Sequence, residues 1–214
     1  AWATAERIAL QMMDAKGTLA VAEARAAVAE RMTGRLGFVG SSEKTRPTIE
    51  ASFKRVLELL ESHLAGRPYL LGGRPAMADF GVWAQLYEAA TDPTPGAIMR
   101  SASPNVMAWV ERMISPASNG PFETWDTLEP TLRPLLTEEV AGLFLPWSEA
   151  NEAAIARDDE TFETSLGGLT WSQAPQKYHA RSLAEIRKKY KAASVAPGLR
   201  AILEQTGCLT YLAR

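Results

Sequence analysis

One segment of this chain, residues 48–66, strongly favours a single backbone conformation. Its sequence, TIEASFKRVLELLESHLAG, places apolar residues three or four positions apart, with polar residues between them. The apolar positions are Ile49, Phe53, Val56, Leu57, Leu60 and Leu64. In a helix of 3.6 residues per turn, these side chains form one stripe, whereas in a strand they would point to both faces. We therefore expect a long amphipathic helix that ends at Gly66 and packs its stripe into a helical core.

Similar spacing along most of the chain predicts a predominantly α protein. We expect one or two helices over residues 4–32 with Gly17 as the break, then helices over about 76–90, 103–114, 137–157 with a kink near Pro146, 183–193 and 197–207. Proline and glycine predict breaks between them, including TDPTPG at residues 91–96 and a long loop with at most short helical pieces over 115–136.

The pattern changes in TFETSLGGLTWSQ, residues 161–173. Two short strand-like runs flank Gly167 and Gly168, which can supply the positive φ angles of a tight turn. We expect one small β-hairpin there. Further on, Ser182 and Glu185 have the spacing of a capping box, which predicts that a helix starts at Leu183 and that residues 176–179 lie in a loop.

Composition and charge exclude several classes of partner. Lys plus Arg total 23 against 25 for Asp plus Glu, so we expect no nucleic-acid partner. We also expect no membrane partner, because no uninterrupted apolar run has membrane-spanning length and AWATAERIAL at the start carries Glu6 and Arg7. The single cysteine, Cys208, rules out an intrachain disulfide and fits a reducing compartment, so we expect a cytoplasmic protein.

A carboxylate stands at the start of the apolar segment RPYLLGGRPAMADFGVWAQLY, residues 67–87. Asp79 lies three residues after Ala76, which is the N-cap if the helix begins at Met77. At this N3 position a carboxylate can accept the backbone N–H of the cap residue and can meet the positive end of the helix dipole. We therefore assign Asp79 a structural role as a helix cap in place of a catalytic one.

This segment, with the DPTP and PNVMAWVERM that follow it, resembles the sixth-helix region of the C-terminal helical domain of glutathione S-transferases. The resemblance covers residues 48–114, and GGLTWSQAPQKYHARSLAEIRKKY is similar to a C-terminal extension of uncharacterised bacterial members. The family usually has Ser or Thr where this chain has Ala76. The resemblance implies an all-α, glutathione S-transferase C-terminal-like helical core over residues 1–136. The hairpin-bearing extension over 137–214 is expected to pack on the same core, so that the whole forms a single domain.

The resemblance also implies a division of function. In this family an N-terminal thioredoxin-like half binds and ionises glutathione, usually with a Val-Pro pair at its cis-proline. Here no proline follows a valine, and we expect that half to be absent from the chain. The implied function is the hydrophobic substrate-pocket and dimerisation half of a glutathione S-transferase-like protein, which forms a homodimer. Glutathione is implied for a full-length member, and this chain alone should bind no cofactor and should not conjugate.

The candidate ligand-binding residues lie in two parts of the chain. The family lines its electrophile pocket partly from the first helix, here with two methionines, and two tryptophans near the hairpin, Trp147 and Trp171, can cover the same pocket with Gln173. A polar cluster after the hairpin, formed by residues 176–179, can donate hydrogen bonds to an anionic ligand, or its His179 can act as a general base. Its alternative role is to anchor the extension on the core. The substrate-pocket candidates are Met12, Met13, Trp171, Gln176, Lys177, Tyr178 and His179.

Other reactive side chains indicate structural roles. His63 has no second His or Cys at ligand spacing, so we expect no metal site. Cys208 follows Gly207 in an apolar setting that raises a thiol pKa, so we expect it to be inert. Two alternatives to the transferase half stay open: a non-catalytic helical binding or assembly module with an exposed apolar patch, and a self-sufficient enzyme built on Tyr178 and His179.

Overall fold

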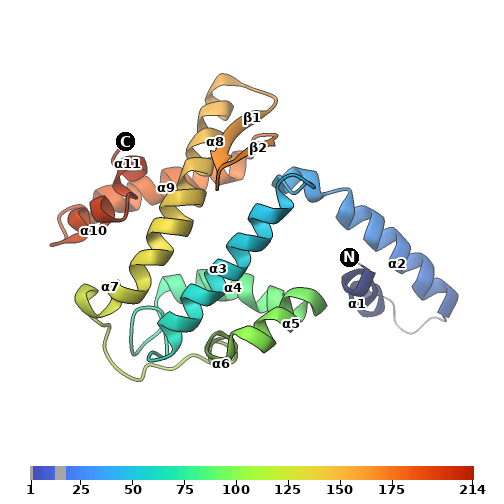
Figure 1. The fold of residues 1–214 in the computed structure, drawn as a ribbon, viewed down its shortest axis with the longest axis horizontal. Coiled ribbons are helices and arrows are strands. Elements are labelled where there is room, and N and C mark those ends of the chain that lie inside the picture. Colours follow the sequence, from blue (N-terminus) through green and yellow to red (C-terminus); the bar gives the residue numbers. More distant parts are fainter. Residues whose placement is uncertain (1, 13–17) are drawn as a thin grey trace.

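The structure, a computed structural model, describes residues 2–12 and 18–214 and is mostly helical, with one antiparallel hairpin (Figure 1). This confirms the expected fold class. The elements are α1 (Trp2–Met12), α2 (Thr18–Thr33), the 3-10 helix η1 (Leu36–Val39), α3 (Arg46–Leu64), α4 (Met77–Thr91), α5 (Pro93–Ala102), α6 (Pro104–Arg112), α7 (Trp125–Pro134), the π-helix η2 (Leu135–Phe144), α8 (Leu145–Arg157), β1 (Phe162–Leu166), β2 (Leu169–Gln173), α9 (Lys177–Ala193), α10 (Leu199–Gln205) and α11 (Leu209–Leu212).

The apolar stripe of α3 divides into two parts. Its second half, Leu57, Leu60 and Leu64, is buried in the main core, together with side chains of α4, α5 and α6 such as Trp109. Its first half is only partly covered, and Ile49 stays exposed. The main core therefore leaves apolar surface near the start of α3.

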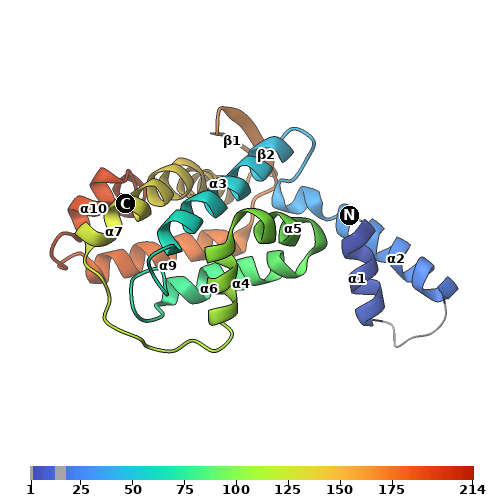
Figure 2. The same ribbon diagram turned by 60° about the horizontal axis from the view of Figure 1, so that its bottom comes forward.

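The first two helices lie to one side of the bundle, as the two views in Figures 1 and 2 agree. They are two separate helices that pack against each other, within the expectation of one or two, while the proposed break at Gly17 lies outside the described residues. A hydrogen bond joins this pair to the bundle, with Thr4 Oγ1 donating to Asp92 Oδ2 at 2.7 Å.

Two predicted breaks each contain part or all of a helix. Residues 91–96 contain the start of α5, because Asp92 acts as N-cap by accepting the Thr94 N–H at 3.2 Å and Pro93 occupies the first helical position. The predicted loop over 115–136 contains α7, although Pro130 lies inside that helix. Contacts with α3 hold α7 in place, and a proline-rich sequence does not reveal such contacts.

The hairpin prediction is confirmed. In the antiparallel register Phe162 lies opposite Gln173 at one end, and Leu166 lies opposite Leu169 next to the turn. Gly167 and Gly168, which form the turn, both have positive φ angles. The predicted start of the next helix is wrong, because α9 begins at Lys177. Ser182 lies inside it and donates its hydroxyl to Tyr178 O at 3.3 Å instead of capping an end.

A second apolar cluster joins the C-terminal helices. Leu145 of α8, Leu183 of α9, Leu212 of α11 and the preceding Cys208 are buried together. Burial raises the pKa of the Cys208 thiol, as expected from its sequence setting. Gly207 has φ +77°, which fits the expected left-handed end of α10, whereas the short α11 beyond it was not predicted. No helix in the described ranges is long and apolar enough to cross a membrane.

The start of α4 has the predicted cap geometry. Ala76 is the N-cap, with extended backbone angles of φ −113° and ψ 170°, and its N–H donates to Asp79 Oδ2 at 2.9 Å. This is half of a capping box, because an alanine side chain cannot accept the N3 amide.

We predict that Ala76→Ser stabilises the protein by about 1 kcal/mol, because the new hydroxyl can accept the Asp79 N–H. Thermal unfolding monitored by circular dichroism measures the effect. Ala78→Ser, on the exposed side of the same first turn, serves as the control and should be close to neutral. An Ala76→Ser protein no more stable than this control would contradict the assignment.

Candidate functional site

A cavity of about 570 Å³ lies where the start of α3 meets the C-terminal extension. Most of its surface is aliphatic or aromatic, and Glu139 is the one ionisable side chain among the described residues that line it. The lining residues are Thr48, Ile49, Ser52, Phe53, Val56, Leu60, Val82, Leu135, Glu139, Val140, Leu143, Phe144, Trp147, Leu166 and Trp171. The size and apolar lining are typical of a site for a small organic molecule.

The π-helix η2 forms one wall of this cavity. Its hydrogen bonds span five residues, as in the bond from the Leu145 N–H to Val140 O just before Pro146. The wider turn places two adjacent pairs of η2 residues on the cavity, 139–140 and 143–144. The expected helix over 137–157 is thus split into η2 and α8, with the change of register beside the proline where we expected a kink. π-helical turns are found frequently at functional sites.

A buried glutamine orients the two indoles of the cavity. Gln173 Oε1 accepts the Nε1–H of Trp171 at 2.7 Å and that of Trp147 at 3.0 Å. Gly40 packs against this group with φ +74°, and a Cβ at that position would lie 2.4 Å from Gln173 Oε1. The loop before α3 therefore supports the aromatic wall and leaves no room for a side chain at residue 40.

The polar cluster after the hairpin lies at the start of α9 and not in a loop. Gln176 is the N-cap, and the buried Asn151 holds its backbone by accepting the Gln176 N–H at 2.6 Å and donating to Gln176 O at 3.0 Å. The His179 ring packs edge-on against Trp147 with centroids 4.9 Å apart, and Tyr178 is 78% exposed. Residues 176–179 do not line the cavity, and of the residues proposed from the sequence the two tryptophans, Trp147 and Trp171, are placed on it.

The two methionine candidates cannot be placed at this site. Met12 is the last residue of α1, and Met13 lies outside the described residues. Two side chains of α1, Thr4 and Ala5, line a different, smaller hollow of about 160 Å³, together with residues of α2 such as Met32.

Sequence reasoning missed most of the cavity wall, although one signal was present. The stripe of α3 continues towards its N-terminus beyond the part needed for the main core, through Val56, Phe53 and Ile49. All three line the cavity. Glu139 and Ser52 carried no such signal, because their neighbourhood depends on how η2 packs against α3.

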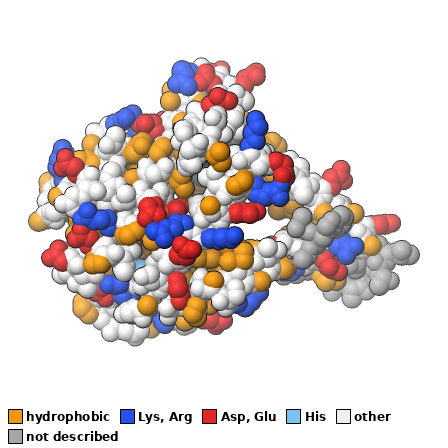
Figure 3. Space-filling view, viewed as in Figure 1, with side chains coloured by type: hydrophobic (Ala, Val, Ile, Leu, Met, Phe, Trp, Pro, Cys, Tyr) orange, Lys and Arg blue, Asp and Glu red, His pale blue; other side chains and the backbone are white. Residues whose placement is uncertain are grey.

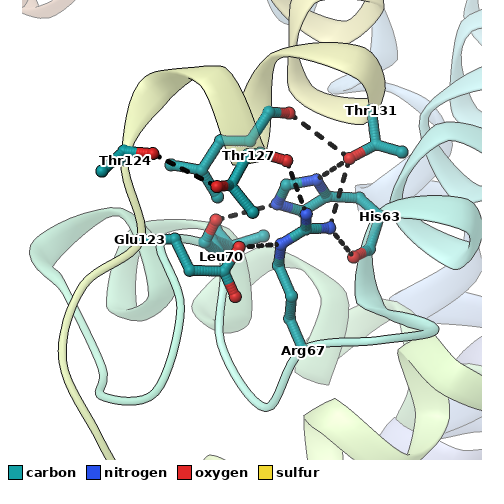
Figure 4. A network of polar contacts seen from close by, with 8 residues as sticks. His63, Arg67, Leu70, Glu123, Thr124, Thr127 and Thr131 are labelled. Carbon is teal, nitrogen blue, oxygen red and sulfur yellow. Dashed lines mark hydrogen bonds and ion pairs between the residues drawn. The ribbon is translucent and has the colours of Figure 1, made fainter.

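His63 belongs to a structural network at the other end of α3 (Figure 4). Its Nε2–H donates to Leu70 O at 2.8 Å, because a carbonyl oxygen can only accept, and in the neutral ring Nδ1 accepts the Thr131 hydroxyl at 2.7 Å. Arg67 donates to Glu123 Oε2 at 2.7 Å and to Thr127 O at 2.8 Å. The His63–Thr131 bond ties α3 to α7, and Arg67 ties the loop after α3 to the same helix through Thr127. No cluster of metal-ligating side chains occurs within residues 2–12 and 18–214.

Burial lowers the pKa of His63 below its ordinary value near 6.5, and the nearby Arg67 charge acts in the same direction, against the raising effect of the hydrogen bond to Leu70. Between the folded pKa and about 6.5, the unfolded chain binds more protons than the folded chain. The contribution of this histidine to stability is therefore present above about pH 6.5 and is lost as the pH falls through the folded value.

We predict that the free energy of unfolding, measured by urea denaturation between pH 8 and pH 5, decreases on acidification with a contribution from His63 of at most about 1.4 kcal/mol per pH unit. His63→Gln should remove this contribution, and His179→Gln should retain it. An unchanged pH profile in His63→Gln would show that another group is responsible.

The surface around the cavity carries both signs of charge. On the face shown in Figure 3, the Lys and Arg side chains are interspersed with Asp and Glu. Next to the cavity, Arg55 donates from Nε and Nη2 to Glu138 at 2.7 and 3.0 Å, and from Nη1 to Glu58 at 3.2 Å. These bonds raise the pKa of Arg55 and lower that of Glu138.

Comparison with known protein families relates the first half of the chain to one of them. Residues 5–112 match the family described as "Glutathione S-transferase, C-terminal domain". No curated protein and no solved structure matches the chain. Residues 113–214, which supply η2, α8 and the hairpin, are not assigned to a family, so the cavity lies between the family-matched region and the unassigned one.

Proposed function

Because the chain belongs to the glutathione S-transferase C-terminal domain family, we propose that it is the part of a glutathione S-transferase-like protein that binds the hydrophobic small molecule. The observation that carries this proposal is the apolar cavity between α3, η2 and the hairpin. Its volume suits a ligand of two or three fused or linked rings, and its aromatic walls are oriented by hydrogen bonds.

As the resemblance to glutathione S-transferases implies, the half of such a protein that binds glutathione for conjugation is thioredoxin-like. In the described ranges the only sheet is the two-stranded hairpin, and the described residues that line the cavity include no Cys, Tyr, Lys or Arg to hold a thiolate. We therefore propose that this chain alone does not turn over glutathione with a generic aryl electrophile. Measurable conjugation by the purified chain would contradict this part of the proposal.

We predict that the protein binds N-phenyl-1-naphthylamine, a neutral probe whose fluorescence increases in apolar sites. Leu143→Trp, which fills the cavity from η2, should weaken binding by about tenfold or more, equivalent to about 1.4 kcal/mol. Val195→Trp introduces the same side chain at a position that is 90% exposed, and should leave binding unchanged. Equal weakening by both variants, or no probe binding by the unmodified protein, would contradict the assignment of the site.

A second function is favoured by one feature of α4. Met77, Phe80 and Tyr87 lie on one face of this helix and are 82%, 46% and 38% exposed, although most of the helix is apolar. We propose that this face packs against a second copy of the chain, as in an assembly module. Sedimentation velocity should show a dimer that Phe80→Lys disrupts, whereas Tyr178→Lys, at another exposed aromatic residue, should leave it intact. A monomeric unmodified protein would exclude this function.

A further inference from the structure

Apart from Thr48, the non-aromatic polar side chains among the described residues that line the cavity are Ser52 and Glu139, a hydrogen-bonded pair here called the acidic pair because Glu139 is a carboxylic acid. Ser52 of α3 donates its hydroxyl to Glu139 Oε2 of η2, and both residues line the cavity. In the described part of the chain, Ser52 is the one hydrogen-bond donor to this carboxylate. A carboxylate has about four acceptor positions. Glu139 therefore retains acceptor capacity beside an otherwise apolar space.

The cation that borders the adjacent hollow, Arg55, is hydrogen-bonded to carboxylates other than Glu139. Arg55 borders a second hollow that also contacts Ser52 and Glu139, but its guanidinium is hydrogen-bonded to Glu138 and Glu58. The guanidinium thus has two other carboxylates as partners, and the described residues that line the cavity include no Lys or Arg. The local field disfavours an anion and favours a positive group at the Ser52–Glu139 pair.

The aromatic lining supports the same ligand class. Phe53, Phe144, Trp147 and Trp171 line the space next to the acidic pair, and aromatic faces attract organic cations as well as apolar rings. An ammonium group at Glu139 would gain a charge-assisted hydrogen bond while its apolar body fills the cavity. A neutral alcohol of the same shape can donate only an uncharged, weaker hydrogen bond to Glu139 besides its apolar contacts.

We propose that the preferred ligand is a hydrophobic amine, with its ammonium group on Glu139 and Ser52 and its ring system between α3, η2 and the two indoles. This inference rests on the proposed function, because it assigns a chemical class to the same cavity. It makes the extension, which supplies Glu139, the part of the protein that determines ligand charge.

The test uses three compounds with one ring system: the cation of 2-(1-naphthyl)ethylamine, the neutral 2-(1-naphthyl)ethanol and the carboxylate anion of 1-naphthaleneacetic acid. Isothermal titration calorimetry at pH 7 should show the amine binding about tenfold or more tighter than the alcohol, with the acetate weakest. Glu139→Gln, which keeps the shape and can still accept from Ser52, should reduce the amine to the affinity of the alcohol and leave the alcohol unchanged. Glu185→Gln, an exposed position on α9, is the charge-matched control and should retain the preference.

The outcomes separate this inference from the proposed function. If N-phenyl-1-naphthylamine binds but the amine is no tighter than the alcohol, or if the amine preference survives in Glu139→Gln, the ligand class is wrong and the apolar site stands. If neither the neutral probe nor any naphthyl compound binds, both proposals are overturned. If Glu139→Gln alters the circular dichroism spectrum, Ser52→Ala is tested in its place. Ser52→Ala retains the Glu139 carboxylate and should therefore retain the amine preference. Loss of the amine preference in Ser52→Ala would overturn the assignment to Glu139.

Discussion

Asp79→Ala is expected to lower the free energy of unfolding by roughly 3–5 kcal/mol. The carboxylate is fully buried and accepts three hydrogen bonds, from the Leu70 N–H at 2.8 Å, the Ala76 N–H at 2.9 Å and the Trp109 Nε1–H at 3.0 Å. Alanine leaves all three donors without this acceptor in the protein interior, and each buried donor left unpaired costs about 1–3 kcal/mol. Urea denaturation at pH 7 measures the loss.

The comparison variants for Asp79 separate its effect from a general effect of capping. Asp126→Ala removes an aspartate from the first turn of α7, where the side chain is exposed, and should cost less than about 1 kcal/mol. Asp79→Asn retains one acceptor oxygen and should fall between the two. If Asp79→Ala were as mild as Asp126→Ala, the three hydrogen bonds would not be holding α4, α6 and the preceding loop together.

Gly40→Ala is expected to destabilise the protein by roughly 2–4 kcal/mol and to abolish binding of the neutral naphthyl probe. Residue 40 has φ +74°, which L-amino acids with a side chain rarely adopt, and the new Cβ would lie 2.4 Å from Gln173 Oε1 and 2.5 Å from Trp171 Cζ2. Gln173 can move only by breaking its bonds to the two indoles. The change therefore affects both folding and the cavity wall.

Two other glycines provide matched controls for this variant. Gly168 has φ +80°, and a Cβ added there would have nothing within 4 Å, so Gly168→Ala should show the backbone cost alone, about 1 kcal/mol. Gly37→Ala has neither a positive φ nor a close neighbour and should be nearly neutral. A Gly40→Ala protein with the stability of Gly168→Ala and intact probe binding would show that Gln173 and the indoles relax without cost.

Local sequence signals predicted the elements whose determinants are close together in the chain. The α3 stripe, the Asp79 cap and the Gly167–Gly168 turn each depend on residues within a few positions of one another, and the structure has all three. The start of α9 was mispredicted because the Ser182–Glu185 spacing competes with a distant contact. Asn151 of α8 holds the Gln176 backbone, so the helix begins at Lys177 instead of Leu183.

The amino-acid sequence by itself determined the helical class of this protein, its one hairpin and the structural role of Asp79, because periodicity and capping act over one or two turns. Only the tertiary structure decided where the cavity lies. Its acidic pair joins Ser52 to Glu139 across 87 residues, and Gln173 draws in Trp147 from α8 and Gly40 from the loop before α3. Such contacts depend on how helices pack, and packing is a property of the whole chain rather than of any short segment.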